Sequence, residues 1–483
     1  MSELEHFPLM VPGATTTASD VTVYAPWDLA PIATVARADG NAVEQALSNA
    51  YALYRDRDKW IPLRERIAIL TRAMGIMKDR REQLAVEAAR EGGKPLGDSL
   101  VEVDRAIDSV HICIEELRTH GGTVIPMSVS ESSKNRVAFT RKEPVGVVVA
   151  VSAFNHPLNL IAHQVAPAIA TGCPAIVKPT DRTAMSCLRF VSIMHEAGLP
   201  AEWCQAVITA DRKDATAMVA DSRVGFFSFI GSAKVGWMLR SQLAPGTRCA
   251  LEHGGAAPVL LTADADMNKA IPSVLKGGFY HAGQVCVSVQ RVFADKSVAR
   301  SFAEKLAEGA DKLIVGDPTD AATEVGPLIV PAEVDRVHEW VEQARAGGAE
   351  VLSGGRKLSE TSYAPTVLLN PPLDANVSKM EIFGPVVCIY ETDSMDAGIE
   401  IANSLPFSFQ AAIYTESLDT AMRASSRLDA SAVMVNDHTA FRVDWMPFAG
   451  LKESGHGVGG VPHSMHEMQV EKMTVIHSPE IQD

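Results

Sequence analysis

Two side chains in this sequence, a cysteine and a glutamate, have the surroundings of catalytic groups. Cys286 follows Ala-Gly-Gln in HAGQVCVSVQ (281–290), where the glycine predicts a turn and the Val/Ser/Val/Gln run predicts a strand. A free cysteine is usually buried and inert, but a thiolate presented by a turn is a nucleophile. Glu252 ends the apolar segment CALE before two glycines. Burial there would raise its pKa towards that of a general base, and an N-cap or a salt-bridged acid is the alternative.

Polar groups also stand at the predicted carboxyl ends of three strands, where parallel α/β sheets bind ligands. Asn155, in SAFNHPLNL, has an amide N–H for a developing oxyanion. Lys178 and Asp181, in IVKPTDRT, can hold ribose hydroxyls. Gly231 and Ser232, in FFSFIGSAKVGWML, precede a predicted helix whose free N–H groups favour an anion. Each segment also has a plain structural explanation: a turn asparagine, a surface Lys/Asp pair and a capped helix.

The elements that position these residues alternate along the chain. Apolar residues at three- and four-residue spacing predict helices over 41–118, and a polar β-hairpin is predicted over 122–143. From residue 145 to about 450, short apolar strands alternate with helices, which predicts an α/β fold with parallel sheets covered on both faces. The strand predicted over 471–478 has no neighbour in sequence, so it can pair with the hairpin of this subunit or of another.

The composition excludes several classes of protein. The formal net charge of −15 argues against nucleic acid or an anionic membrane as a partner, and no apolar run is long enough to span a bilayer. The seven cysteines have scattered spacings without a CxxC pair. We therefore expect free thiols, no metal site and a reducing, cytoplasmic compartment. We also expect no signal peptide.

The motifs taken in order are more specific than any one of them. The series FNHP, KPT, FIGS, LEHGG, GQVC, EIFGPV and MPFAGLKESG resembles the aldehyde dehydrogenase superfamily from about residue 20 to 480. The resemblance implies two doubly wound parallel-sheet domains, a Rossmann-like cofactor domain (1–121 and 144–252) and a catalytic domain (253–450). It also implies a small β oligomerisation element (122–143 and 465–483) in a homodimer or homotetramer.

The resemblance assigns the chemistry to three residues. It makes Cys286 the nucleophile that adds to an aldehyde to form a thiohemiacetal, which loses hydride to a nicotinamide and becomes a thioester. The Asn155 amide and the Cys286 backbone N–H resemble the oxyanion hole, and Glu252 stands at the position of the base that activates water. An acylating, coenzyme A-dependent enzyme generally lacks that base, so the free acid is the expected product.

The cofactor residues follow from the same resemblance. Gly231 and Ser232 match the phosphate-side turn, Lys178 and Asp181 the adenosine ribose contacts, and Glu381 the nicotinamide ribose contact, with Phe383 beside the ring. The carboxylate of Asp181 disfavours a 2′-phosphate, which favours NAD. Aspartate is one methylene shorter than the glutamate usual at that position, so NADP stays open.

The substrate is less well defined by the sequence. His156 and Arg442 are the candidate substrate residues, the first for a polar substrate and the second for a carboxylate or phosphate held bidentately. A histidine packed at a helix start and an arginine paired with Asp444 or Asp437 are the alternatives. We expect a small hydroxy-aldehyde or semialdehyde, with an aromatic aldehyde as the second candidate. A thiol hydrolase would need a histidine beside Cys286, and a catalytically idle protein would not need these residues.

Overall fold

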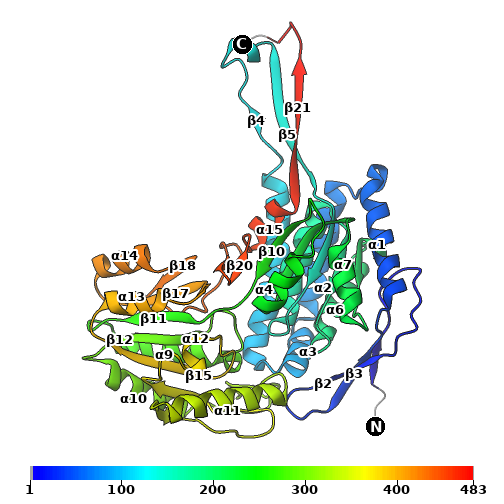
Figure 1. The fold of residues 1–483 in the computed structure, drawn as a ribbon. Coiled ribbons are helices and arrows are strands. Elements are labelled where there is room, and N and C mark those ends of the chain that lie inside the picture. The colour runs from blue at the N-terminus through cyan, green and yellow to red at the C-terminus, as the bar shows by residue number, and fades with distance from the viewer. Residues whose placement is uncertain (1–3, 482–483) are drawn as a thin grey trace.

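The computed structural model describes residues 4–481. Two helix-covered β-sheets lie side by side, and a narrow antiparallel sheet projects away from them as an arm (Figure 1). Nearly all strands of the two large sheets pair in parallel. The predicted α/β class with parallel sheets is therefore confirmed.

The first large sheet has the strand order β20-β10-β9-β6-β7-β8, and only β20 is antiparallel to its neighbour. Its strands are β6 (Val147–Val151), β7 (Ala175–Lys178), β8 (Cys204–Ala206), β9 (Val224–Ile230), β10 (Arg248–Glu252) and β20 (Gly455–His456). Successive side chains point to opposite faces of a strand, so Val148 enters one apolar cluster while Val147 and Val149 enter another. This is why the sheet needs helices on both faces.

The helices divide between these two clusters. One face is covered by α2 (Leu63–Asp79), α3 (Arg81–Gly92), α4 (Leu96–Thr119), α5 (Pro157–Thr171) and α6 (Ala184–Glu196). The other face is covered by α1 (Gly40–Arg55), α7 (Arg212–Ala220) and α8 (Ala233–Arg240). Gly172 ends α5 with a φ of 86°, a left-handed conformation that glycine adopts without strain.

The order of the strands places two loops next to each other. From β6 the chain moves outward through β7 to β8, and it then returns to the other side of β6 as β9. The loops that follow β6 and β9 therefore diverge from the same point of the sheet, which is where open α/β sheets bind ligands. These loops contain Asn155 and Gly231, respectively.

The second large sheet has the order β13-β14-β15-β12-β11-β17-β18. Its strands are β11 (Ala257–Leu261), β12 (Val289–Asp295), β13 (Glu350–Ser353), β14 (Thr366–Leu369), β15 (Val386–Thr392), β17 (Gln410–Tyr414) and β18 (Ala432–Val435). Its core is a third apolar cluster, to which the helices of this half contribute. They are α9 (Met267–Phe279), α10 (Ala299–Ala310), α11 (Pro331–Ala346), α12 (Asn376–Lys379), α13 (Met395–Asn403) and α14 (Leu418–Arg427).

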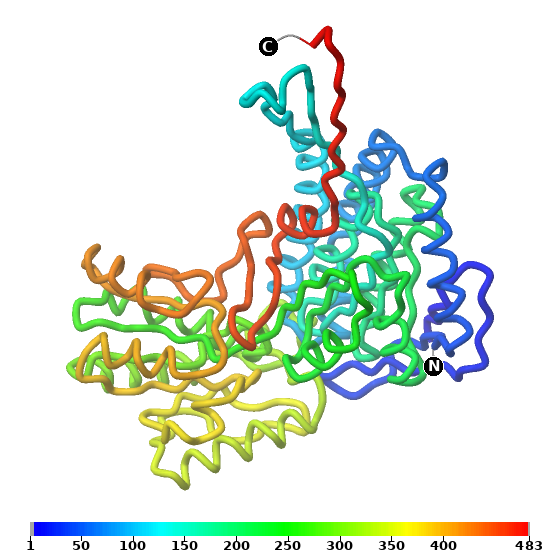
Figure 2. Tube along the Cα trace, turned by 45° about the horizontal axis from the view of Figure 1, so that its top comes forward, coloured from blue at the N-terminus to red at the C-terminus, as the bar shows by residue number. Residues whose placement is uncertain are grey.

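The arm consists of β4 (Val124–Ile125), β5 (Arg136–Pro144) and β21 (Gln469–His477). The last of these pairs antiparallel with β5 along its whole length, from Gln469 opposite Pro144 to His477 opposite Arg136. The C-terminal strand thus pairs within its own chain, as Figure 2 also shows where the red end of the tube follows the cyan hairpin.

The remaining strands and helices are short. Near the N-terminus β1 (Glu5–Phe7), β2 (Val21–Tyr24) and β3 (Pro31–Val35) form a small sheet. Near the C-terminus β16 (Phe407–Ser408) pairs with β19 (Leu451–Lys452), and α15 (Val461–Glu467) leads into β21. Within residues 4–481 no helix has the length and hydropathy needed to cross a bilayer.

One local prediction was wrong in detail, and the alternative of a capped helix at Ser232 is observed only in part. The strand predicted directly after Cys286 begins only at Val289, because Cys286 and Val287 belong to a turn. Ser232 does occupy the N-cap position of α8, but its side chain makes no capping hydrogen bond. The hydroxyl of Ser232 is therefore not engaged by the helix that follows it.

Candidate active site

A cavity of about 550 Å³ lies between the two large sheets. The first sheet contributes the ends of its strands and the loops that follow them, whereas the second contributes the segments that precede β12 and β15. Every residue that the sequence analysis singles out for catalysis, cofactor or substrate lines this cavity: Asn155, His156, Lys178, Asp181, Gly231, Ser232, Glu252, Cys286, Glu381, Phe383 and Arg442.

A left-handed turn presents the candidate nucleophile. His281, Ala282 and Gly283 have φ values of 51°, 54° and 69°, an arrangement that only glycine adopts without strain. A side chain at position 283 would overlap the carbonyl of Gly384. The turn leaves Cys286 partly exposed, whereas most of the other cysteines are buried.

Gln284 fixes this turn through its own side chain. Its amide nitrogen donates to the carbonyls of Pro327 (3.1 Å) and His281 (3.2 Å), and its amide oxygen accepts from the backbone N–H of Ile329 (3.0 Å). Because Gln284 is only 1% exposed, these bonds are shielded from water. The backbone two residues before Cys286 is therefore held from three directions.

Asn155 reaches the same turn from the first sheet. Its Nδ2 donates to the carbonyl oxygen of Gln284 at 2.9 Å, and the side chain is 5% exposed. An amide nitrogen has two N–H groups, so one bond leaves a second donor at the cavity wall. This geometry suits a donor to an oxyanion formed beside Cys286.

Charges of both signs act on the thiol and the carboxylate. Burial raises the pKa of Cys286 to about 12, and the charge of Arg442 opposes this while those of Glu381 and Glu252 add to it. Burial also raises the pKa of Glu252, again opposed by Arg442. Glu252 forms no ion pair within residues 4–481, so the alternative of a salt-bridged acid is not observed. A side chain at position 459 would overlap its carboxylate, so Gly459 makes room for it.

The residues matched to the cofactor form the other end of the cavity. Burial lowers the pKa of Lys178, while the nearby charge of Asp181 opposes that shift. Asp181 and Ser232 are exposed at the rim. A Cβ at position 231 would stand 2.9 Å from the ring of Phe229, which explains the glycine at this turn.

Glu381 and Phe383 complete this end. One carboxylate oxygen of Glu381 is buried without a hydrogen-bond partner, and burial raises the pKa of the group to about 8. An unpartnered acceptor of this kind fits a ribose hydroxyl donor. Phe383 has a φ of 48° and meets the ring of Phe154 edge-on with centroids 5.7 Å apart. A bulky residue in that conformation is strained, which is common at binding sites.

The two candidate substrate residues have different surroundings. The ring of His156 meets those of Tyr280 and His281 edge-on, with centroids 6.4 Å and 6.1 Å away, and burial lowers its pKa well below the ordinary value. Arg442 forms no ion pair within residues 4–481, so the expected alternative of a salt bridge with Asp444 or Asp437 is not observed.

Sequence reasoning missed the true partner of Asp444. Arg105, on α4, donates to both of its carboxylate oxygens at 2.7 Å and 3.1 Å and also lines the cavity. Arg105 lies within the helices predicted over 41–118, but no motif in the sequence marks it as a residue of the cavity.

Known proteins are similar to this chain over nearly its whole length. The Aldehyde dehydrogenase family profile matches residues 14–474. The chain is 35% identical over 479 residues to the 3-sulfolactaldehyde dehydrogenase of Priestia aryabhattai, covering 99% of both chains.

Two solved structures are also similar. Aldehyde dehydrogenase 21 from Physcomitrella patens, in complex with the reaction product succinate, has a TM-score of 0.94 and 31% identity, with 99% of this chain and 100% of that one covered. Glyceraldehyde-3-phosphate dehydrogenase GapN from Methanocaldococcus jannaschii, complexed with NADP, has a TM-score of 0.91 and 34% identity, with 96% and 100% covered. The chain belongs to the aldehyde dehydrogenase family of NAD(P)-dependent oxidoreductases.

Proposed function

We propose that this enzyme oxidises a small polar aldehyde to its carboxylic acid through a thioester on Cys286. The observation that carries the proposal is the convergence of a partly exposed thiol, a free amide N–H and a desolvated carboxylate on one cavity. These are the groups needed to add to a carbonyl, stabilise the oxyanion and activate water.

The steps on the protein follow from these groups. The Cys286 thiol gives up its proton to solvent as its sulfur adds to the aldehyde carbon. The second N–H of Asn155, with the backbone N–H of Cys286, stabilises the oxygen that becomes negative. Re-formation of the carbonyl expels hydride and leaves the thioester. Glu252 then takes a proton from water, which attacks the thioester and releases the acid and the thiol.

The dinucleotide, when bound, supplies the acceptor of that hydride. We assign its phosphates to Gly231 and Ser232, its adenosine ribose to Lys178 and Asp181, and its nicotinamide ribose to Glu381, with Phe383 beside the ring. The unpartnered carboxylate oxygen of Glu381 supports the assignment. We favour NAD because Asp181 repels a 2′-phosphate, although the GapN relative is complexed with NADP. On this assignment residues 1–121 and 144–252 bind the cofactor and 253–450 supply the nucleophile.

The substrate end supports a polar aldehyde that bears an anionic group. Arg442 offers an unpaired guanidinium to the cavity, and His156 contributes a polar ring beside it. The three similar proteins are named for, or bound to, anionic compounds: 3-sulfolactaldehyde has a sulfonate, succinate two carboxylates and glyceraldehyde 3-phosphate a phosphate. Neither the cavity residues named here nor these compounds favour an aromatic aldehyde.

A thiol hydrolase is the second candidate, and the geometry argues against it. Both ring nitrogens of His281, five residues before the thiol, are buried without a partner, so that ring does not activate the sulfur. The charges acting on Cys286 come from Arg442, Glu381 and Glu252.

The test is a steady-state absorbance assay of NADH or NADPH formation with a panel of aldehydes, with and without coenzyme A. We expect turnover to the free acid without coenzyme A. Turnover only with coenzyme A would establish the acylating reaction instead, and ester hydrolysis without reduction of the dinucleotide would establish the hydrolase.

We also propose a homodimer or homotetramer assembled through the arm. Its strands expose apolar side chains, including Val137, Met473, Val475 and Ile476. Apolar groups gathered on a projecting sheet are typical of an interface. Light scattering tests this, and a monomeric mass would contradict it.

The seven cysteines are all free thiols, which supports a reducing, cytoplasmic location.

A further inference from the structure

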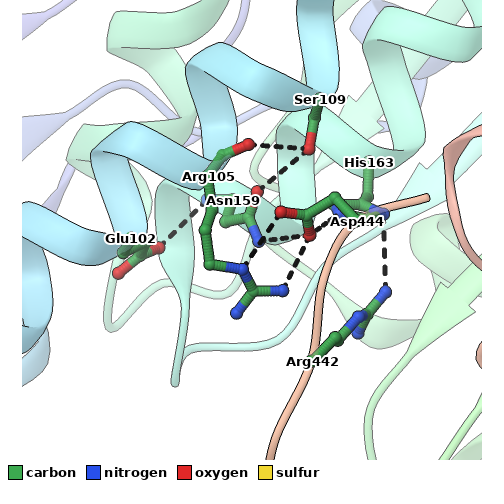
Figure 3. Close-up of polar contacts among 7 residues, drawn as sticks. All are labelled: Glu102, Arg105, Ser109, Asn159, His163, Arg442 and Asp444. Atoms are coloured by element: carbon green, nitrogen blue, oxygen red, sulfur yellow. Dashed lines mark hydrogen bonds and ion pairs between the residues drawn. The ribbon is translucent and has the colours of Figure 1, made fainter. Parts of the chain in front are cut away.

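A buried polar cluster stands behind Arg442 at the substrate end of the cavity (Figure 3). Its centre is Asp444, which is 2% exposed and accepts two hydrogen bonds from Arg105. His163, on α5 and 4% exposed, lies with its Nε2 atom 2.6 Å from the same carboxylate. Nδ2 of Asn159 lies 3.4 Å away. These bonds join α4, α5 and the loop that contains Arg442.

The carboxylate of Asp444 fixes the tautomer of His163. Its own pKa lies well below the ordinary value because His163 and Arg105 act on it, so it accepts hydrogen bonds and donates none. The Nε2 atom of His163 must therefore carry a proton. Burial, with the charge of Arg442 adding to it, lowers the pKa of His163 to about 4, so the ring is neutral at physiological pH. A neutral ring protonated at Nε2 has a lone pair at Nδ1.

That lone pair faces the guanidinium of Arg442. Nη2 of Arg442 lies 3.5 Å from Nδ1 of His163, at the outer limit of a hydrogen bond, and the guanidinium carbon stands 3.6 Å from the centroid of the Phe448 ring. His163 and Phe448 thus orient the planar group without a carboxylate. The Nε atom of Arg442 is buried and has no partner.

The cluster leaves one cation without an ion pair. Asp444 is paired with Arg105 and His163 is neutral, so Asp444 and Glu252 act on Arg442 only from a distance. None of the ion pairs in the described part of the chain includes Arg442. A desolvated guanidinium that forms no ion pair favours the binding of an anion at close range.

We propose that Asp444 and His163 are positioning residues that hold Arg442 as the receptor for an anionic group on the substrate. The ligand chemistry is an aldehyde with a sulfonate, carboxylate or phosphate a few atoms from the carbonyl. The planar fork of arginine matches the oxygens of all three groups. This inference rests on the proposed function, because it assigns a second contact to the aldehyde that Cys286 attacks.

A different role for Arg442 makes a different prediction. Its charge also lowers the pKa of Cys286, and an arginine that served only to activate the thiol would benefit every aldehyde equally. An arginine that binds the substrate's anion benefits only the charged aldehyde. The preference between matched aldehydes therefore separates the two roles.

The experiment compares two pairs of aldehydes that differ only in the anionic group. 3-Sulfolactaldehyde is compared with lactaldehyde, and glyceraldehyde 3-phosphate with glyceraldehyde. We expect the wild-type enzyme to prefer an anionic member by about 100-fold in kcat/KM, the scale of one charged hydrogen-bonded contact. The pairs also distinguish the sulfonate from the phosphate.

Two variants then test the role of His163. His163→Leu removes the donor to Asp444 and the acceptor for Arg442, so we expect KM for the preferred anionic aldehyde to rise about 10-fold, with kcat/KM for its neutral counterpart unchanged. His163→Gln keeps a neutral donor and acceptor, so it should restore most of that loss. Arg57→Gln is the control, because Arg57 also stacks on an aromatic ring, that of Trp60, but does not line the cavity.

The outcomes separate this inference from the proposed function. If no aldehyde is oxidised, the proposed function fails. If the wild-type enzyme oxidises both members of each pair equally well, only the anion receptor is overturned, and this result does not depend on any variant folding. An equal loss on charged and neutral aldehydes in His163→Leu would overturn the role of His163.

Discussion

The side chain of Asn155 donates a hydrogen bond to the carbonyl oxygen of Gln284 at 2.9 Å, and so joins the first sheet to the turn that presents Cys286. The two residues are separated by 129 positions in the chain. The bond fixes the orientation of the amide, whose second N–H is the donor assigned to the oxyanion. One side chain therefore links the two halves of the protein beside Cys286.

Asn155→Ala should lower kcat by about 100- to 1,000-fold on every aldehyde, because one oxyanion donor is lost. Asn49→Ala is a matched control. The side-chain amide of Asn49 donates hydrogen bonds to the Pro12 carbonyl and the Gln205 side chain, and none of these residues lines the cavity. That variant should lose stability without a comparable loss of kcat. Steady-state kinetics and thermal unfolding of both variants check this, and a full rate in Asn155→Ala contradicts the assignment.

Cys286→Ser should abolish dehydrogenase activity and leave dinucleotide binding intact, because a hydroxyl is a far weaker nucleophile at neutral pH. Cys249→Ser is the control, since Cys249 is the other partly exposed thiol and does not line the cavity. It should retain full activity. Fluorescence titration of the dinucleotide and the aldehyde assay measure both properties.

Glu252→Gln should form the thioester and then stall, since the amide cannot take a proton from water. We expect a burst of about one NADH per site in stopped-flow absorbance, followed by a steady rate lowered by about 100- to 10,000-fold. Undiminished steady turnover would assign the base to another group.

Asp181→Ala should raise the efficiency with NADP relative to NAD by about 10-fold, because a carboxylate that repels the 2′-phosphate is removed. Measuring kcat/KM for both dinucleotides at one aldehyde concentration gives the ratio. An unchanged ratio would mean that another residue sets the preference.

Glu381 should make stability depend on pH. Burial raises its pKa in the folded protein to about 8, from an ordinary 4.5. Between these values the folded state keeps a proton that the unfolded chain releases, so the stability contributed is complete below pH 4.5 and is lost as the pH rises through about 8.

Glu381→Gln removes this titration. The decrease in the free energy of unfolding between pH 5 and pH 9 should be smaller in the variant than in the wild type, by at most about 1.4 kcal/mol for each pH unit of the window. Urea unfolding at several pH values measures it. Glu453→Gln, at an exposed site, is the control, and equal pH profiles for the wild type and Glu381→Gln would contradict the prediction.

Local signals in the sequence predicted much of the fold and the residues of the cavity. Glycines such as Gly172 and Gly198 end helices because they adopt a positive φ, and alternating strands and helices predict parallel sheets. The loops after such strands meet at one edge, so residues as distant as Asn155 and Glu252 could be expected in one place.

Other contacts have no local signal. Arg105 and Asp444 are 339 positions apart, and neither stands in a recognisable motif. Asp444 forms its ion pair with Arg105 and not with Arg442, which is nearer in sequence. This choice of partner depends on how α4 packs against α5. Gly283 predicts the turn before Cys286, but the sequence does not predict the positive φ of His281 and Ala282, because those residue types rarely adopt it.

The C-terminal segment has a consequence for how the enzyme is made. After β18 the chain contributes Arg442, then β19 beside the second half, β20 on the first sheet and β21 on the arm. A ribosome-bound chain that stops before Gly455 already contains Cys286, but it lacks an edge strand beside Glu252. Every residue that lines the cavity lies at or before Phe448, so the growing chain contains the whole lining before the edge of the first sheet beside Glu252 is paired.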